Sequence, residues 1–136
     1  MTRSKTIFLV EDNRLYQLLF IQVLKDIKYA ILYGVANNGK EALEKLENSA
    51  VLPDLIVSDI NMPIMDGMQC LTEIKKNPKI KDIPVAILSS STSQIELVRK
   101  LGAKVFLKKT SDGNTLREQL EQIIHTDFTD DRHMTI

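Results

Sequence analysis

The chain has 136 residues, of which 43% are hydrophobic and 26% are charged, and its formal net charge at pH 7 is zero. This composition is typical of a single globular domain, and the zero net charge argues against direct nucleic-acid binding or attraction to a membrane surface. No apolar run reaches the ~20 residues that span a bilayer, and no signal-peptide core follows Met1, so we expect a cytoplasmic protein without a membrane partner.

Strand-like and helix-like patterns alternate five times along the chain, which predicts a parallel sheet with helices on both faces. The first strand, residues 7–10, precedes a helix from Arg14 to about Lys25. The apolar stripe of this helix, the side that normally packs against a core, is predicted to be Leu15, Leu18, Leu19 and Val23. A second strand at 30–35 and a turn at 37–39 lead into a helix at 40–48.

The middle of the chain continues the alternation. A third strand, residues 55–58, is separated by a loop at 61–67 from a helix near 68–76. Asn77-Pro78 should end that helix, because the residue before proline avoids the α region. Pro84 then introduces the fourth strand.

The last third predicts two more helices around a fifth strand. Ser93 and Glu96 have the spacing of a capping box, and Gly102 is suited to end the helix that they begin. The fifth strand is expected at 104–108 and the last helix at about 115–125. Residues 126–136 are polar, and we expect them to form a mobile tail after a domain that comprises residues 1–125.

The cysteine and the histidines carry little functional information. The single cysteine, Cys70, excludes an internal disulfide and falls within a predicted amphipathic helix, which favours a buried packing role. His125 and His133 have no partner at metal-ligand spacing, so we expect solvated side chains and no zinc site.

Four apolar runs end on reactive polar residues. Glu11-Asp12 follows the first strand, Asp59 the third, Ser89 the fourth and Lys108-Lys109 the fifth. If the strands are parallel, these endings converge at the carboxyl edge of one sheet, where open α/β folds bind ligands. Carboxylates, a hydroxyl and an ammonium group together suit a divalent cation beside a phosphoryl group, and Mg²⁺ prefers such oxygen ligands.

The acidic residues also have ordinary structural explanations. Glu11 and Asp12 could cap the following helix, whose dipole favours negative charge, and a lone aspartate such as Asp59 is usually a turn residue. Their combination at neighbouring strand ends favours a shared site instead. In that site Asp59 is a candidate nucleophile, because a carboxylate can attack phosphorus to give an acyl phosphate.

The hydroxyl and lysine candidates are chosen by position. Residues 89–93 form a serine-rich loop that would ordinarily cap a helix, but Ser89, the first after the strand, is placed to hydrogen-bond a phosphoryl oxygen. Neighbouring strand residues point to opposite sides, so only one of Lys108 and Lys109 should enter the crevice, and we choose Lys109. No P-loop motif follows any strand, which leaves nucleotide triphosphate binding unsupported.

These residues resemble the receiver domain of bacterial two-component response regulators, in particular chemotaxis regulators. The likeness covers roughly residues 5–125 and implies a flavodoxin-like, doubly wound, five-stranded parallel sheet of order 2-1-3-4-5 with five helices on two faces. It rests on Val10-Glu11-Asp12-Asn13, Asn38-Gly39-Lys40-Glu41-Ala42-Leu43, Pro53-Asp54-Leu55-Ile56-Val57-Ser58-Asp59-Ile60-Asn61-Met62-Pro63, Met65-Asp66-Gly67, Ile83-Pro84-Val85 and Gly102-Ala103.

The resemblance implies a role for each acidic residue. Asp59 would be the phosphoacceptor, which takes a phosphoryl group from a phosphohistidine on a sensor histidine kinase or a histidine phosphotransfer protein. Glu11 and Asp12 would form the acidic pocket. Asp12, Asp59 and the backbone carbonyl of Asn61 would bind Mg²⁺, with Glu11 beside them.

It also implies a switch. Lys109 would pair with the phosphoryl group, Ser89 would move to hydrogen-bond it, and Phe106 would be the aromatic switch residue. Asn61 and Ser91 would tune the lifetime of the phosphate. The chain departs from the family at Thr110, where proline after a cis peptide bond is common, and this leaves the Lys109-Thr110 geometry open.

The predicted function is that of a phosphorylatable signalling receiver in a phosphorelay, a phosphoprotein with no enzymatic activity beyond its own phosphorylation and dephosphorylation. Phosphorylation would switch the face of the fourth helix, fifth strand and last helix for binding a downstream protein, as a monomer or as a phosphorylation-dependent dimer. That face contains Ile95, Val98, Arg99, Lys104, Phe106 and Lys108.

Three alternatives stay open. No helix-turn-helix pattern follows His125, which favours a stand-alone regulator over a receiver excised from a longer DNA-binding regulator. An aspartate-dependent phosphatase would carry a second aspartate two residues after Asp59, where Asn61 stands. A degenerate receiver that serves only as a scaffold is disfavoured by the presence of Asp59 and Lys109.

Overall fold

The computed structural model describes residues 3–128 and 133–136. Its sheet has the order β2-β1-β3-β4-β5-β6, and every neighbouring pair is parallel. The strands are β1 (Lys5–Val10), β2 (Ala30–Ala36), β3 (Leu55–Asp59), β4 (Val85–Ser89), β5 (Val105–Lys108) and β6 (Met134–Thr135). The predicted order of the first five strands is confirmed, and a short sixth strand extends the sheet beyond β5.

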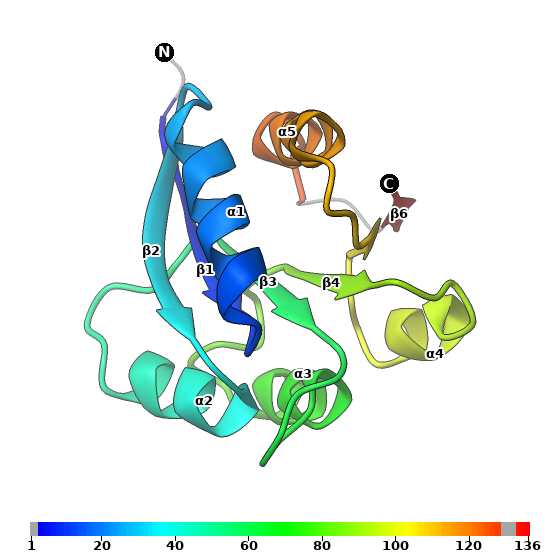
Figure 1. Ribbon diagram of the computed structural model, residues 1–136. Helices are drawn as coiled ribbons and strands as arrows, with labels where there is room; N and C mark the ends of the chain where they lie inside the picture. Colours follow the sequence, from blue (N-terminus) through cyan, green and yellow to red (C-terminus); the bar gives the residue numbers. More distant parts are fainter. Residues whose placement is uncertain (1–2, 129–132) are drawn as a thin grey trace.

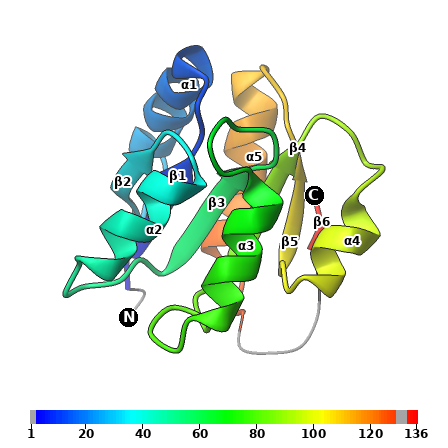
Figure 2. The same cartoon turned by 90° about the horizontal axis from the view of Figure 1, so that it is seen from below.

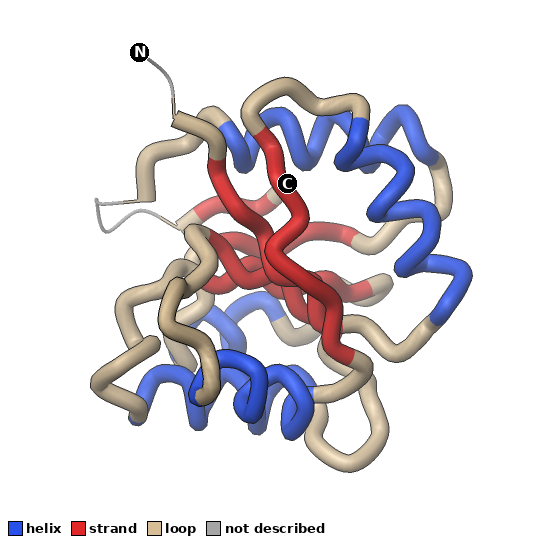
Figure 3. Tube along the Cα trace, turned by 90° about the vertical axis from the view of Figure 1, so that its left-hand side faces the viewer, coloured by secondary structure: helices blue, strands red, loops and turns tan. Residues whose placement is uncertain are grey.

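Two helical layers enclose this sheet (Figure 3). The helices are α1 (Arg14–Lys25), α2 (Gly39–Glu47), α3 (Gly67–Lys76), α4 (Ile95–Lys100) and α5 (Gly113–Ile124). α1 and α5 lie on one face of the sheet, and α2, α3 and α4 lie on the other (Figures 1 and 2). The doubly wound architecture with five helices on two faces is therefore confirmed.

The central strands are apolar because both of their faces are covered. Every residue of β3 and β4 is buried, as expected for parallel strands between two helical layers. One core, around Phe8, packs under α2, α3 and α4, and the other, around Phe20, packs under α1 and α5. Cys70 is fully buried in the first core, which confirms its packing role.

Side-chain caps fix where four of the helices begin. The carboxyl or amide oxygens of Asn13, Asn38, Asp66 and Asp112 accept hydrogen bonds from backbone N–H groups in the first turns of α1, α2, α3 and α5. The predicted ends also hold: Asn77 follows α3, and Gly102 has a φ of 108° after α4.

The predicted capping box before α4 is wrong. The N-cap residue is Gln94, which makes no side-chain capping bond. The hydroxyl of Ser93 instead lies 2.9 Å from the hydroxyl of Ser91, within the serine-rich loop. α4 has six residues and no side-chain cap, so it is the helix of this fold with the least local support.

The predicted buried stripe of α1 is also wrong. Leu15 and Leu18 are 78% and 48% exposed, and Leu19 and Val23 are only partly buried. The buried face is rotated from that stripe and comprises Tyr16, Gln17, Phe20 and Leu24. Gln17 is drawn inward because its amide donates hydrogen bonds to the carbonyl of Glu11 and to Asn37.

The end of the chain differs from the expected mobile tail. Met134 and Thr135 form β6, which pairs with β5, and residues 129–132 lie outside the described part of the chain. His125 and His133 are both exposed, as predicted, and Nδ1 of His133 also lies 2.9 Å from the carbonyl oxygen of Ala103. Among the helices of the described residues, none combines the length and apolar character that crossing a bilayer requires.

Candidate functional site

The carboxyl ends of β1 and β3 bring three acids together. Glu11 and Asp12 directly follow β1, Asp59 ends β3, and one carboxylate oxygen from each lies within 4.8 Å of the others. The register explains this convergence, because Val10 pairs with Ser58, the residue before Asp59. The predicted acidic cluster is present at the predicted edge of the sheet.

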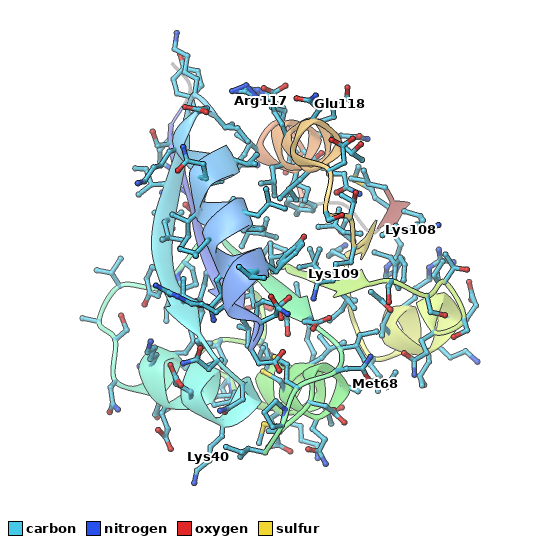
Figure 4. The ribbon with its side chains drawn as sticks, in the orientation of Figure 1. Lys40, Met68, Lys108, Lys109, Arg117 and Glu118 are labelled. Carbon is cyan, nitrogen blue, oxygen red and sulfur yellow. The ribbon has the colours of Figure 1, made fainter. Side chains whose placement is uncertain are left out.

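Lys109 neutralises part of this negative charge. Its Nζ lies 2.6 Å from Oε1 of Glu11 and 3.2 Å from Oδ2 of Asp59. Figure 4 labels Lys109 on the side of β5 near α1, and its neighbour Lys108 on the side near β6. Of the two neighbouring lysines, Lys109 is therefore the one that enters the crevice, as predicted.

Burial and charge act in opposite directions on these groups. Burial of the Lys109 ammonium lowers its pKa. The ion pairs with Glu11 and Asp59 have the larger, opposite effect, so the pKa of Lys109 lies above the ordinary lysine value. Burial raises the pKa of Glu11, a fully buried carboxyl, against the opposing effect of its contacts with Lys109 and the N–H of Asn13. The crevice therefore holds negative charge that only Lys109 offsets within the described residues.

Asp59 is held by its own backbone and by Lys109. Its Oδ1 accepts a hydrogen bond of 2.9 Å from the N–H of Ile60, and its side chain remains 10% exposed. The buried carboxylate thus has a fixed orientation and keeps an opening to solvent. Both properties suit a nucleophile that must meet a reagent carried by another molecule.

Gly67 supports the position of Asp59, a role that sequence reasoning missed. A Cβ at this position would lie 2.1 Å from the carbonyl oxygen of Asp59, and the N–H of Gly67 donates a 2.7 Å hydrogen bond to the carbonyl of Ile60. Only glycine permits this close approach of α3 to the end of β3. The signals in the sequence were the dipeptide Asp66-Gly67, which marks a turn, and its place in the motif Met65-Asp66-Gly67.

Ser89 ends β4 and is buried. Its hydroxyl accepts a 3.2 Å hydrogen bond from the N–H of Ser91, and its carbonyl accepts a 2.8 Å bond from the N–H of Lys109. The backbone thus ties Ser89 to the lysine of the site. Ser91 and Asn61, the two predicted lifetime residues, are exposed at the ends of β4 and β3.

Phe106 lies in the middle of β5 and is 3% exposed. Its ring belongs to the core under α2, α3 and α4, and Val98 of α4 is buried in the same core. Both were predicted on the interaction face of the fourth helix and fifth strand. In this structure they are interior, whereas Lys108, which was predicted on the same face, is exposed, as is Leu97 of α4.

Tyr16 is a further residue of the site that sequence reasoning missed. Its ring lies under the ammonium of Lys109, 4.6 Å from Nζ to the ring centroid, and its hydroxyl is buried without a hydrogen bond. Burial raises the pKa of Tyr16, and the negative charges of Glu11 and Asp59 raise it further. Tyrosine is found both in protein cores and at surfaces, so the hydropathy pattern alone could not predict that Tyr16 is buried.

We expect Tyr16→Leu to lower the rate of the phosphate uptake that the sequence predicts, measured with acetyl phosphate, several-fold and the free energy of unfolding by about 1–3 kcal/mol. The reason is loss of the ring that holds Lys109. Tyr16→Phe is the matched control, because it keeps the ring and removes only an unpaired hydroxyl, and its stability should stay within about 1 kcal/mol of the unchanged chain. Urea unfolding and labelling kinetics measure both effects, and equal losses in the two variants would contradict this role.

The acidic residues fit a divalent cation. Oε1 of buried Glu11 has no hydrogen-bond partner of good geometry and depends on its ion pair with Lys109. Asp12 is exposed and Asp59 partly accessible, so two carboxylates face an opening. A set of hard oxygen donors that leaves room for water and phosphate oxygens is the type of site that Mg²⁺ occupies.

No cis peptide bond occurs in the described residues, so the Lys109-Thr110 bond that the sequence left open is trans. Among the same residues, Glu11, Asp12 and Asp59 form the only group of three histidine, cysteine or acidic side chains arranged to hold one metal ion.

Comparison with known sequences identifies a family. The model of the response regulator receiver domain matches residues 7–121. The chain is 30% identical over 117 residues to the chemotaxis protein CheY of Listeria monocytogenes, an alignment that covers 85% of this chain and 95% of that protein. It is 36% identical over 135 residues to a protein-glutamate methylesterase/protein-glutamine glutaminase of Desulfotalea psychrophila. There it covers 91% of this chain but spans only about a third, 36%, of the relative.

Solved structures give the same answer. The phosphorylated cyanobacterial phytochrome response regulator RcpA superposes with a TM-score of 0.77 at 31% identity, covering 88% of this chain and 91% of that one. The Mn²⁺-bound form of the response regulator Rcp1 superposes with a TM-score of 0.76 at 30% identity, covering 90% and 96%.

Proposed function

Because the chain belongs to the response regulator receiver family, we propose that it is a signalling receiver in which Asp59 accepts a phosphoryl group from a phosphohistidine. Phosphorylation and Mg²⁺ binding are general in this family. The observation that carries the assignment to Asp59 is its carboxylate at the end of β3, 3.2 Å from the ammonium of Lys109 and within 4.8 Å of the oxygens of Glu11 and Asp12.

The transfer is one displacement at phosphorus. A carboxylate oxygen of Asp59 attacks the phosphorus atom and the P–N bond of the phosphohistidine breaks. Its electron pair stays on the imidazole nitrogen, and an acyl phosphate remains on Asp59. Lys109 holds the negative charge of the phosphoryl oxygens. Mg²⁺, bound by Asp12, Asp59 and the Asn61 carbonyl with Glu11 beside them, would supply further charge neutralisation.

The donor is a sensor histidine kinase or a histidine phosphotransfer protein, and the product state acts on a downstream protein. Phosphorylation adds nearly two negative charges to the crevice. Ser89 would then bond the phosphoryl group, and the rearrangement would reach Phe106 and the face of α4, β5 and α5. Moving a two-state population from 1:99 to 99:1 in this way requires about 5.5 kcal/mol of preferential stabilisation.

The test is labelling with acetyl phosphate. With Mg²⁺, intact-mass spectrometry should show one added phosphoryl group that hydroxylamine removes, as expected of an acyl phosphate. With EDTA in place of Mg²⁺ the label should be absent. A label that persists in EDTA, or that resists hydroxylamine, would contradict the proposed chemistry.

We also propose that the chain acts in the cytoplasm as a stand-alone regulator, without enzymatic activity beyond its own phosphorylation and dephosphorylation. The stand-alone form is supported by two relatives of similar size: the alignments with this chain span 95% of the Listeria CheY and 98% of the CheY of Thermotoga maritima. The alternative is a receiver at the front of a longer protein, as in the methylesterase relative. The length of the native reading frame separates the two.

Substitution of Asn61 or Ser91 should change the rate of dephosphorylation by several-fold. Both residues are exposed beside the ends of β3 and β4, so they can control how water reaches the acyl phosphate without supporting the core. Loss of phosphate from the labelled chain measures the rate, and urea unfolding should give a stability within about 0.5 kcal/mol of the unchanged chain. Unchanged rates in both variants would contradict this role.

A further inference from the structure

The outer edge of β5 is occupied by the end of the chain itself. In Figure 2, β6 lies beside β5 next to the C-terminus, on the same side of the molecule as α4. The N–H groups of Met134 and Ile136 donate hydrogen bonds of 3.0 and 2.8 Å to the carbonyls of Lys104 and Phe106. The N–H of Lys108 donates a 3.0 Å bond to the carbonyl of Ile136. Segment 133–136 thus satisfies backbone groups that an edge strand would otherwise leave open.

We propose that this edge of β5 is a docking site for an extended peptide of a partner protein, and that segment 133–136 is the occupant that the peptide must displace. The proposal rests on the proposed function in one respect, because the edge belongs to the output face of α4, β5 and α5. The segment binds as a strand parallel to β5. The partner peptide should therefore also bind as a parallel strand, with apolar side chains at alternate positions.

The side chains of the segment support this pattern. Met134 and Ile136 are partly buried against the core under α1 and α5. His133, which precedes Met134, and Thr135, which lies between the two apolar residues, are exposed. Nδ1 of His133 contacts the carbonyl oxygen of Ala103 at 2.9 Å, and the amide of Gln119 lies 3.4 Å from the carbonyl oxygen of Ile136. The segment is therefore held by its backbone, by alternate apolar contacts and by the His133 ring, and an apolar-x-apolar peptide can reproduce the first two.

Segment 133–136 also closes the groove between α4 and β5. The cavity that remains there has a volume of about 10 Å³ and is lined by His133 and Met134 together with Val98, Phe106 and neighbouring residues. A partner cannot enter this groove while the segment is in place. The lining includes the proposed switch residue Phe106. Movement of the Phe106 ring would therefore change the same cavity that segment 133–136 closes.

The occupant is suited to displacement. β6 has two residues and the whole segment has four, so few contacts must break before a peptide that makes the same contacts can replace it. The segment competes because it is tethered to the end of α5 by a short connection, which gives it an effective concentration of about millimolar. Free peptide at micromolar concentration should therefore bind only when the segment is released.

The experiment uses the full chain and two proline variants. Met134→Pro removes a donor to Lys104, whereas Thr135→Pro removes an N–H that alternation directs away from β5 and serves as the matched control. The probe is a fluorescein-labelled peptide with the sequence of residues 127–136, and binding is measured by fluorescence anisotropy without phosphorylation. We expect the Met134→Pro chain to bind it at least tenfold more tightly than the unchanged chain and Thr135→Pro.

Hydrogen exchange gives a second readout, because the Lys108 amide should exchange at least tenfold faster in Met134→Pro than in Thr135→Pro. The proposal is overturned if Met134→Pro fails to bind the peptide, if the unchanged chain binds equally well, or if Lys108 exchange is unchanged. It is also overturned if Met134→Pro dimerises without peptide, since a second copy would then be the occupant. All three chains should be labelled equally by acetyl phosphate. Failure of labelling counts against the proposed function alone.

Discussion

Asp59→Asn should abolish phosphate uptake from acetyl phosphate, while the fold is retained. The neutral amide is a poor nucleophile toward phosphorus, so no acyl phosphate can form at this position. The substitution is nearly isosteric, and the amide oxygen can still accept the hydrogen bond from the N–H of Ile60. Lys109 keeps its ion pair with Glu11. Intact-mass spectrometry in the presence of Mg²⁺ measures the result directly.

Asp66→Asn is the matched control for this variant. Asp66 caps α3 through a 2.9 Å hydrogen bond from the N–H of Gln69, and asparagine is an equally good N-cap residue. The same chemical change is thereby made near the site but outside the acidic cluster, and labelling should equal that of the unchanged chain. If Asp59→Asn is labelled as fully as Asp66→Asn, the acceptor lies elsewhere.

The site could be predicted from the sequence because its geometry follows from the topology. Parallel strands deliver their carboxyl ends to one edge, so Glu11, Asp12 and Asp59 had to meet if the apolar runs were strands. The alternation of side chains along a strand allows only one of Lys108 and Lys109 to enter the crevice, and Lys109 was chosen because it stands at the strand exit. Neither inference depends on details of packing, and the structure places all of these residues as expected.

The helical residues of the site could not be predicted in the same way. The most regular apolar stripe of α1, which includes Leu15 and Leu18, is largely exposed, whereas Gln17 is buried by hydrogen bonds to groups outside the helix. A hydropathy pattern counts glutamine as polar and contains no information about partners far along the chain. The position of Tyr16 against Lys109 was missed for the same reason.

β6 and the start of α4 show a second limit, which is length. Two residues, Met134 and Thr135, carry no detectable strand period, and their pairing depends on the free edge of β5. The capping-box pattern of Ser93 and Glu96 is equally short. The capping box does not form, because the Ser93 hydroxyl makes a hydrogen bond with the Ser91 hydroxyl and not with the backbone of α4. The outcome for such short motifs depends on contacts that the pattern does not show, which are local for Ser93 and tertiary for β6.

Lys109→Met should lower both phosphate uptake and stability, and the two losses have separable causes. Without the ammonium, the charge of buried Glu11 keeps only the hydrogen bond from the N–H of Asn13, and the free energy of unfolding should fall by about 2–3 kcal/mol. This loss of stability is at the lower end of, or below, the loss usual for breaking a buried ion pair, because the side chain of Lys109 is 22% exposed and solvent weakens the interaction. Phosphate uptake should fall about a hundredfold, because charge stabilisation of the transferring group is lost.

The double variant Lys109→Met/Glu11→Gln separates these causes. The neutral amide of the second substitution removes the buried charge and can still accept the hydrogen bond from the N–H of Asn13, so most of the lost stability should return in urea unfolding with EDTA present. Phosphate uptake should stay low, since the cation that faces Asp59 is still missing. If stability fails to recover, the loss comes from packing of the lysine stem. If uptake recovers, Lys109 serves the fold and not the transfer.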